Sequence, residues 1–438
     1  MNKFRIIIII FSIITIVIAL ILFGRGGSPT PGQNLANVPL LKVWGTAPKQ
    51  IFSAAFENYG KTTKTQIAYT EIDANSFDTK ILEALASNNA PDAIITDADW
   101  IIENRNKITP PAMTTARIAD FKNVFVDSVS ASLILTKKID KNSNVTPDYI
   151  IAMPLWLDPI VLFWNKDIFN AENIALPPAN WEEFSTISNK IKQTDATGNV
   201  QRAGSAMGRA SNIPRYKETL ALLTLQQGVD SKLGFNGDKN TYSKLESAVR
   251  FYTDFNKSNF SSYTWNEKLP EPQDLFAQGK LGMMLDYMST SKLLTVKNPH
   301  LSFNIALAPQ PKGSEVPIHT AQIIAITVPA VSKNNTAAWN FATWLAGSAP
   351  AVSFLDGQTI APARRDVLRN AKVSANSLYP IIKETSLNTR RFRDLVPAQT
   401  SAILANMLDS IADGRSTISE SLTDALRRIT RANKENIQ

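Results

Sequence analysis

The sequence predicts an α/β protein built as two lobes, and three observations support this. The chain has 438 residues, enough for a core in each of two domains or lobes. Apolar patterns follow a β-α-β-α-β order over residues 40–96, which implies a parallel sheet with helices on its faces. Residues 150–169 form an apolar, strand-like run that Pro154 and Pro159 interrupt and that carries Asp158 at its middle.

The run at residues 150–169 is the stretch around which we organise the chain. Proline cannot donate to a sheet ladder, so this run should enter or leave a sheet rather than cross its centre. We interpret it as a strand leaving one lobe, a crossing near residues 154–159, and a strand of the second lobe that ends at Asn165. Trp156 and Asp158 would then lie where the lobes meet, a preferred place for a ligand cleft. The alternative is an ordinary core strand with a buried, satisfied aspartate, and this stretch alone leaves both open.

The other elements follow from hydrophobic spacing. Strands are predicted at residues 40–44, 66–72, 92–96, 281–285, 305–308 and 322–328, and helices at residues 50–59, 77–86, 242–255 and 336–345. Two further helices begin with a capping-box pattern, one at Asn180 with Glu183 and one within residues 414–420. Ligands in open parallel sheets bind beyond the carboxyl ends of the strands, where residues 44–46 and 96–100 fall.

Composition excludes several kinds of site. The chain has no cysteine, so disulfides, thiolate metal sites, cysteine nucleophiles and lipid attachment to an N-terminal cysteine are excluded. With only two histidines, His300 and His319, we expect no multi-histidine metal centre and no cofactor. The formal charge of +8 is spread without a long basic run, which indicates a mildly basic surface and not a nucleic-acid site.

Residues 6–23 predict a membrane segment. Their polar members are Ser12 and Thr15, and at 1.5 Å per residue the run makes about 27 Å of helix, just enough to span a bilayer. The flanking basic residues place the N-terminus in the cytoplasm and the body outside the cell. A cleavable signal peptide is the alternative, although no Ala-x-Ala-like site follows. We expect an anchor over residues 1–24 and a flexible linker over residues 25–38.

A series of short motifs, in a fixed order over residues 40–431, carries a family resemblance. They are Leu41-Lys42-Val43-Trp44, Ala90-Pro91-Asp92-Ala93-Ile94, Ile151-Ala152-Met153-Pro154, Trp164-Asn165-Lys166-Asp167, Trp181-Glu182-Glu183-Phe184, Phe276-Ala277-Gln278-Gly279-Lys280, Pro362-Ala363-Arg364 and the helix after Gly414-Arg415. Each motif is weak alone, but together they are specific. The chain resembles the extracellular solute-binding proteins that feed ABC importers, the group that contains maltose-binding protein.

The resemblance implies a type II periplasmic-binding-protein fold, with ligand trapped between two lobes by hinge closure. Each lobe would be a mostly parallel sheet flanked by helices. It divides the chain into a first lobe at residues 39–155 and 300–347 and a second lobe at residues 156–299 and 348–438.

The resemblance also suggests the ligand-binding residues. A sugar offers an apolar face to aromatic rings and hydroxyls to polar side chains. The resemblance and the residues themselves together give nine candidates: Trp156, Asp158, Asp99, Asp97, Tyr287, Trp44, Thr46, Ser289 and Trp265. Trp156 departs from the family pattern, because it is an aromatic residue that maltose-binding protein lacks, and Trp265 is chosen for its place in a polar loop. The structural alternatives are core packing for the tryptophans and helix capping for Asp97 and Asp99. His319 and Gln322 are weaker candidates. Position 401 is a serine and not an aromatic residue, so a maltodextrin is not the expected ligand.

The predicted function is therefore non-catalytic. The protein would capture a mono- or oligosaccharide at the extracellular face of the membrane and deliver it to the permease subunits of an ABC importer. The alternatives are a sensor or scaffold that uses the same closing lobes, and a glycoside hydrolase with Asp99 and Asp158 as its carboxylate pair. The sequence has no nucleophile, phosphate-loop or zinc-protease motif, so we do not expect an enzyme.

Overall fold

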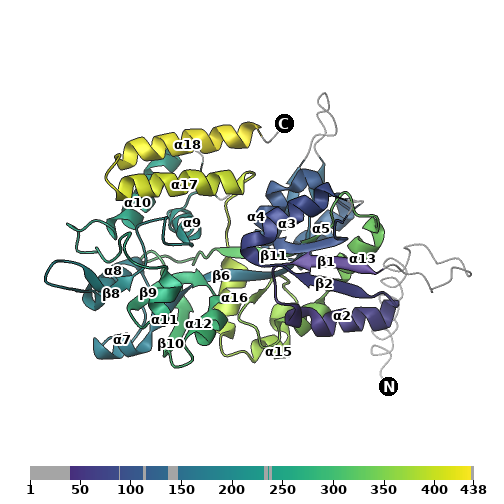
Figure 1. The fold of residues 1–438 in the computed structure, drawn as a ribbon, viewed down its shortest axis with the longest axis horizontal. Coiled ribbons are helices and arrows are strands. Elements are labelled where there is room, and N and C mark those ends of the chain that lie inside the picture. The colour runs from purple at the N-terminus through teal and green to yellow at the C-terminus, as the bar shows by residue number, and fades with distance from the viewer. Residues whose placement is uncertain are drawn as a thin grey trace, which may run out of the picture.

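The structure is a computed structural model, and its central element is strand β6 (Met153–Asn165). The structure describes residues 40–435 except residues 88, 112–114, 137–146, 231–234 and 236–238. Among these, a sheet follows the path β2-β1-β3-β11-β6-β9-β8-β7, and β10 and β12 also pair with β6. β6 takes part in both halves of this sheet, and the two halves lie to either side of it in Figure 1.

The two halves of β6 have different neighbours. Its first half pairs with β11 and β12, and from Ile160 onward it pairs with β9 and β10. We call the half that contains β1, β2, β3 and β11 the first lobe, and the half that contains β7 to β10 the second lobe. A separate small sheet joins β4 and β5. The strands other than β6 are β1 (Leu41–Gly45), β2 (Ile67–Glu71), β3 (Ala93–Asp97), β4 (Ile134–Thr136), β5 (Asp148–Ile150), β7 (Gln193–Thr194), β8 (Val200–Ser205), β9 (Leu281–Tyr287), β10 (Phe303–Leu307), β11 (Ala321–Thr327) and β12 (Ala361–Pro362).

The two prolines of β6 lie where its pairing is irregular or changes. Pro154 lies opposite Ala325, directly after the register shift in β11. Pro159 lies opposite Ala321, the first residue of β11, and the next residue, Ile160, begins the pairing with β9. A proline has no N–H for the ladder, so these are positions where its absence costs least. The predicted crossing near residues 154–159 is confirmed, as one continuous strand.

Helices cover the sheet on both sides. Figure 1 shows α2 on one side of β1 and β2 and α3 and α4 on the other, and α17 and α18 stacked over the second lobe. The helices are α2 (Lys49–Thr63), α3 (Ala74–Ala86), α4 (Ala98–Glu103), the 3-10 helix η2 (Arg105–Lys107), α5 (Thr115–Val124), α6 (Asp127–Leu133), α7 (Lys166–Ala171), α8 (Trp181–Ile191), α9 (Tyr216–Gln226), α10 (Lys239–Asp254), α11 (Pro272–Ala277), α12 (Thr290–Lys297), α13 (Asn335–Leu345), α14 (Ser348–Leu355), the 3-10 helix η3 (Val367–Arg369), α15 (Ala371–Ser374), α16 (Tyr379–Asn388), α17 (Pro397–Ala412) and α18 (Ile418–Glu435).

The predicted helix starts are confirmed at the level of single hydrogen bonds. The Asn180 side chain accepts the backbone N–H of Glu183 at 3.0 Å, and Glu183 reaches back to the N–H of Ala179 at 2.8 Å. At the start of α18, Thr417 and Glu420 each accept the other's backbone N–H. These bonds satisfy donors that the first turn of a helix leaves free.

The core follows β6 through both lobes. Ile160 and Leu162 belong to an apolar cluster with α8, α9, α10, α17 and α18, whereas Val161 and Phe163 belong to a cluster on the opposite face. Successive side chains of a strand point to opposite faces, so both faces of β6 are buried. Side-chain packing on both faces therefore positions the residues of β6 at the junction of the lobes.

Three chain segments cross between the lobes side by side. The N–H of Ile160 in β6 bonds to the carbonyl of Thr320, at 2.9 Å. The N–H of His319 bonds to the carbonyl of Asn388 at 3.1 Å, and the N–H of Arg390 bonds to the carbonyl of His319 at 2.8 Å. Crossing strands of this kind are where a two-lobed protein bends when its lobes close.

The prediction of mostly parallel sheets is wrong. β1–β2, β1–β3 and β8–β9 are parallel pairs, but β11 and β6 run antiparallel to each other and to the strands that flank them. The reason is that β6 leaves the first lobe and β11 returns to it, so the two crossing strands must run in opposite directions.

The division of the chain between the lobes remains a prediction. Two contacts favour moving its boundaries. Phe354 of α14 packs against Phe52 of α2, with ring centroids 5.9 Å apart, which favours placing residues 348–388 with the first lobe. β10 pairs with the second half of β6, which favours placing residues 303–307 with the second lobe.

The predicted membrane segment, residues 6–23, and the linker lie outside the described residues. Within residues 40–435, apart from the gaps given above, no helix is both long and apolar enough to cross a bilayer. The anchor therefore remains a prediction.

Candidate functional site

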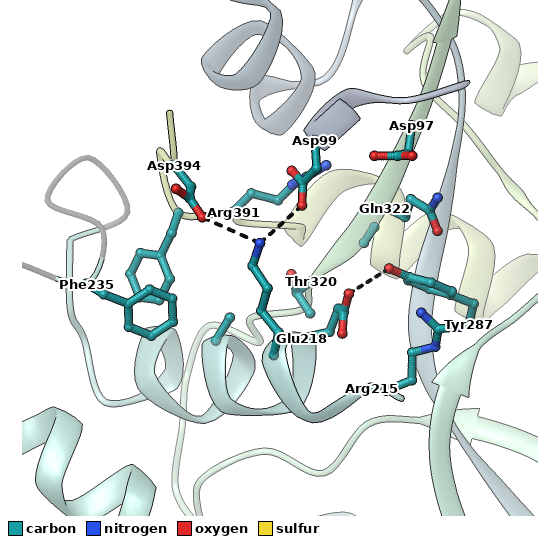
Figure 2. A pocket seen from close by; sticks show the side chains of 14 residues that line it. Asp97, Asp99, Arg215, Glu218, Phe235, Tyr287, Thr320, Gln322, Arg391 and Asp394 are labelled. Atoms are coloured by element: carbon teal, nitrogen blue, oxygen red, sulfur yellow. Dashed lines mark hydrogen bonds and ion pairs between the residues drawn. The ribbon is translucent and has the colours of Figure 1, made fainter. Parts of the chain in front are cut away.

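A cavity of about 250 Å³ lies between the two lobes. Figure 2 shows its lining. The first lobe contributes Asp97 and Asp99, the second contributes the start of α9 and Tyr287, and the crossing segments contribute residues 320–322 and 391–394. A pocket that draws its lining from both lobes and from the crossing segments changes shape when the lobes move.

Asp97 and Asp99 lie at the carboxyl end of β3, as the sequence predicts. Asp97 caps α4, because its Oδ1 accepts the backbone N–H of Trp100 at 2.9 Å. Burial, and then the nearby Asp99, raise the pKa of Asp97. Asp97 therefore caps α4, and among the described residues its other oxygen, Oδ2, accepts only from Thr96 Oγ1, at 3.4 Å. A capping aspartate with a spare oxygen can still accept a hydrogen bond from a ligand.

Asp99 ties the two lobes together. It accepts from Arg391, and its Oδ2 lies 3.4 Å from the Lys217 Nζ of α9. Burial alone would raise the pKa of Asp99, but the Lys217 and Arg391 cations outweigh it and lower the pKa to about 2. Lys217 also lies 3.4 Å from Asp394 Oδ2. Asp99 is therefore ionised at neutral pH and forms part of a charged bridge across the cleft.

The second lobe adds a compact group around Tyr287, at the end of β9. Its O–H donates to Glu218 Oε1 at 3.0 Å, and the Arg215 guanidinium lies 4.3 Å from its ring centroid. Arg215 Nε in turn donates to the buried Asp286 at 3.0 Å. Burial, and then Glu218, hold the pKa of Tyr287 well above its usual range, so the phenol stays protonated. These contacts fix the ring at the cavity wall.

Aromatic side chains close one end of the pocket. Phe392 follows Arg391 in the crossing segment, and its ring centroid lies 4.7 Å from that of Phe235. Figure 2 shows Phe235 on the side of the cavity away from Tyr287. The pocket thus combines apolar rings with charged groups, a mixture typical of small-molecule sites.

Among the described residues, three buried polar atoms of the pocket lining have no hydrogen-bond partner: the acceptors Glu218 Oε2 and Asp394 Oδ2, and the donor Arg391 Nη1. Asp394 Oδ2 has an ion-pair partner, Lys217 Nζ at 3.4 Å, so Glu218 Oε2 and Arg391 Nη1 are the two deficits that remain. Leaving a buried polar group unpaired costs about 1–3 kcal/mol. A ligand that offers both a donor and an acceptor would remove both deficits.

The structure brings three of the nine predicted site residues to this pocket. Asp97, Asp99 and Tyr287 line it, and so does the weaker candidate Gln322. Thr46 is half-buried in the loop after β1, and Trp44 packs with Ile94 in a separate apolar cluster; neither lines the pocket. His319 is fully buried in the crossing segment beside the pocket, and burial lowers its pKa to about 4, so it is neutral.

The two tryptophans predicted to stack on ligand belong to the interior. Trp156 is 5% exposed, and its ring centroid lies 5.8 Å from that of Phe52 and 5.7 Å from that of Phe354. Trp265 is fully buried, and its indole N–H donates to Asn212 Oδ1 at 3.0 Å. Neither side chain lines the pocket. The structure therefore places both tryptophans in the core, which is the structural alternative that the sequence left open.

Asp158 and Ser289 contact each other and not the pocket. Asp158 is buried and accepts both the backbone N–H of Ser289, at 3.1 Å, and its hydroxyl. Burial raises the pKa of Asp158 to about 7, against the lowering effect of these hydrogen bonds. Its neighbour across the ladder, Gln322, does line the pocket. Asp158 therefore links β6 to the start of α12, directly behind the site.

Sequence reasoning missed the basic and acidic residues of α9 and of the segment after α16. They are Arg215, Lys217, Glu218, Arg391 and Asp394. One signal was present: Lys217 lies in the first turn of a helix, where the helix dipole disfavours a cation. A lysine there indicates an acidic partner elsewhere in the fold, but the sequence does not say which. In the described part of the chain, no group of three histidine, aspartate or glutamate side chains is arranged to hold a metal ion.

The comparisons with known proteins agree with this geometry. Residues 43–352 match the sequence model of the bacterial extracellular solute-binding protein family. A Brucella abortus (strain 2308) protein, named only as a binding protein, is 23% identical over 387 residues, which are 86% of each chain.

Solved structures share the fold at low sequence identity. UgpB from Mycobacterium tuberculosis, in complex with glycerophosphocholine, has a TM-score of 0.71 at 14% identity and covers 92% of this chain and 100% of its own. The sugar-binding protein MalE from Xanthomonas citri has a TM-score of 0.70 at 14% identity and covers 91% of this chain and 98% of its own. An ABC transporter solute-binding protein from Thermotoga lettingae, bound with α-D-tagatose, has a TM-score of 0.67 at 17% identity and covers 90% of this chain and 99% of its own. With two lobes, three crossing segments and a family match over residues 43–352, this chain belongs to the bacterial extracellular solute-binding proteins.

Proposed function

We propose that this protein captures a small hydroxylated solute, a mono- or oligosaccharide, between its lobes and delivers it to an ABC-type permease. The observation that carries the proposal is the pocket itself. Both lobes line it, and it holds a buried acceptor and a buried donor, Glu218 Oε2 and Arg391 Nη1, that have no hydrogen-bond partner within the described part of the chain. Each hydroxyl of a sugar is both donor and acceptor, so a sugar suits both atoms.

Size and surface refine the proposed ligand. The cavity of about 250 Å³ lies just below the usual volume of ligand sites, about 300–1,000 Å³, so it favours one sugar ring over a long chain. Tyr287, Phe235 and Phe392 supply the flat apolar surface that a ring can lie against. Several neighbours of the same fold are described with carbohydrate ligands, among them tagatose and mannotriose, which supports the same class here.

We also propose where in the cell the protein acts. The body would act at the extracellular face of the membrane, held by residues 6–23 and a linker at residues 25–38. Membrane fractions of cells that express the full chain should retain the protein, whereas a chain that begins at residue 39 should not be retained there. Recovery of a product that lacks residues 6–23 in the soluble exported fraction would favour signal cleavage.

A thermal-shift screen of the full chain against sugars, polyols, peptides and phosphorylated metabolites tests the capture. A ligand that binds only the folded form at 100 times its Kd adds about 2.7 kcal/mol of stability, so a binder should stand out. Tyr287→Ala should weaken its binding by about 1–3 kcal/mol. Tyr242→Ala on α10 is the matched control, because Tyr242 contacts Ser419 of α18 and not the pocket. Equal loss in both variants, or turnover of a sugar, would contradict the proposal.

A further inference from the structure

The charges around the pocket do not balance. Three cations line it, and each has a carboxylate: Arg215 pairs with Asp286, Lys217 with Asp394, and Arg391 with Asp99. Two carboxylates remain, Asp97 from the first lobe and Glu218 from the second. Within the described part of the chain, no ion pair reaches either of them.

The two surplus carboxylates also have unused acceptor capacity. Glu218 Oε1 accepts from Tyr287, but Oε2 is buried and has no partner among the described residues. Asp97 Oδ1 accepts from the backbone of α4, and Oδ2 has, in the part of the chain that the structure describes, only the Thr96 hydroxyl, at 3.4 Å. Figure 2 shows the two carboxylates on opposite sides of the cavity, with Gln322 at a height between them and Thr320 beside Glu218. A ligand in this space is offered acceptors from both sides.

A buried carboxylate without a cation is unfavourable, because burial penalises the charged form. The raised pKa of Asp97, caused by burial and then by Asp99, is the effect expected of such a group. An anionic ligand would add a further negative charge to this surplus. A neutral sugar would satisfy the acceptors but would add no positive charge, so the carboxylates of the site would still outnumber its cations.

We propose that the solute captured here carries a positive charge: a protonated amine on a hydroxylated frame, that is, an amino sugar or an amino polyol. The ammonium would lie between Asp97 and Glu218, and a hydroxyl oxygen would accept from Arg391 Nη1, the buried donor that lacks a partner. An ammonium group has three donors and no acceptor, which matches two carboxylates that only accept. This inference rests on the proposed function, because it names the charge of the solute that the same pocket takes.

Three probes with the same ring and different charge test it. Glucosamine, glucose and glucuronate are titrated into the full chain and binding is followed by calorimetry and by thermal shift. Glucosamine should bind at least tenfold more tightly than glucose, and glucuronate should be the weakest. If glucose or glucuronate binds and glucosamine does not, the charge inference fails while sugar capture stands. If none of the three binds, and no sugar or polyol in the wider screen does, the proposed function fails with it.

Two isosteric variants give a second measurement that needs no ligand. Glu218→Gln and Asp97→Asn keep the bond from Tyr287 and the cap of α4, and remove only charge. Asp97→Asn should raise the melting temperature of the unliganded protein by roughly 2 °C, because burial and the neighbouring Asp99 disfavour the charge that it removes. The pair together should abolish the preference for glucosamine over glucose. The control is Glu182→Gln, since Glu182 lies at the surface, with Lys312 at 3.0 Å. A fall in melting temperature with the preference intact would overturn the inference.

Discussion

Replacement of Trp156 by alanine distinguishes most sharply between the two possible roles of that side chain. A tryptophan that stacks on ligand would weaken binding when removed and would leave stability nearly unchanged. The structure predicts the reverse, because Trp156 is 5% exposed and its ring is held between Phe52 of α2 and Phe354 of α14. This packing joins β6 to two helices that are distant in the sequence.

The size of the effect follows from those contacts. Truncation of a buried tryptophan to alanine costs about 3–5 kcal/mol through lost transfer energy and the cavity left behind. Each aromatic pair adds about 0.5–1.5 kcal/mol beyond area burial, so we expect a loss near the upper end of that range. Trp156→Phe is the matched control, because it keeps a ring between both neighbours, and its loss should be clearly smaller.

Urea unfolding, followed by far-UV circular dichroism, measures the change in stability. The two lobes need not unfold together, so the midpoint of the transition of the first lobe is the quantity to compare. Ligand affinity is measured separately by calorimetry, below the melting temperature of the variant. A tenfold loss of affinity with an unchanged midpoint would refute the placement of Trp156 in the core.

Three further outcomes are expected. Lys217→Met removes the cation that bridges Asp99 and Asp394, so the lobes should separate more easily. Small-angle scattering would detect this as a larger radius of gyration of the unliganded protein, and an unchanged radius would argue against the bridge. Asp158→Asn should abolish a pH dependence of the free energy of unfolding. Because the pKa of Asp158 is about 7 in the folded protein, the folded protein keeps a proton between pH about 4 and 7 that the unfolded chain has lost. Stability should therefore fall as the pH rises through that window, by up to roughly 4 kcal/mol in total. Denaturation midpoints at pH 5 and pH 8 measure this, and a variant with the same pH slope as the parent would contradict it. Asn180→Ala should cost about 1 kcal/mol by removing the cap of α8, measured by the same unfolding method; no change would show that the cap contributes nothing.

The elements that local patterns define could be predicted from the sequence. Strands β1, β2 and β3 with α2 and α3 between them follow directly from hydrophobic spacing, and Asn180 and Glu183 mark the start of α8. Asp97 and Asp99 could be placed at the site because the carboxyl end of a parallel strand is a general position for ligands.

The parts that depend on pairing between distant segments could not be predicted. Nothing local shows that β11 returns beside β6, so the antiparallel centre of the sheet was missed. The role of Trp156 depends on Phe354, nearly 200 residues away in the chain, and the charge of the site depends on Arg391 meeting Asp99. An aromatic or charged side chain near a cleft looks the same in sequence whether it faces the ligand or the core.

The most direct test of the whole account is the position of a bound solute. A crystal structure of the protein with a ligand identified in the thermal-shift screen should show that ligand between the lobes, in contact with Asp97, Glu218 and Arg391, with the ring of Tyr287 beside it. Ligand density outside this pocket, with no hydrogen bond from the ligand to Glu218 Oε2 or Arg391 Nη1, would contradict the account.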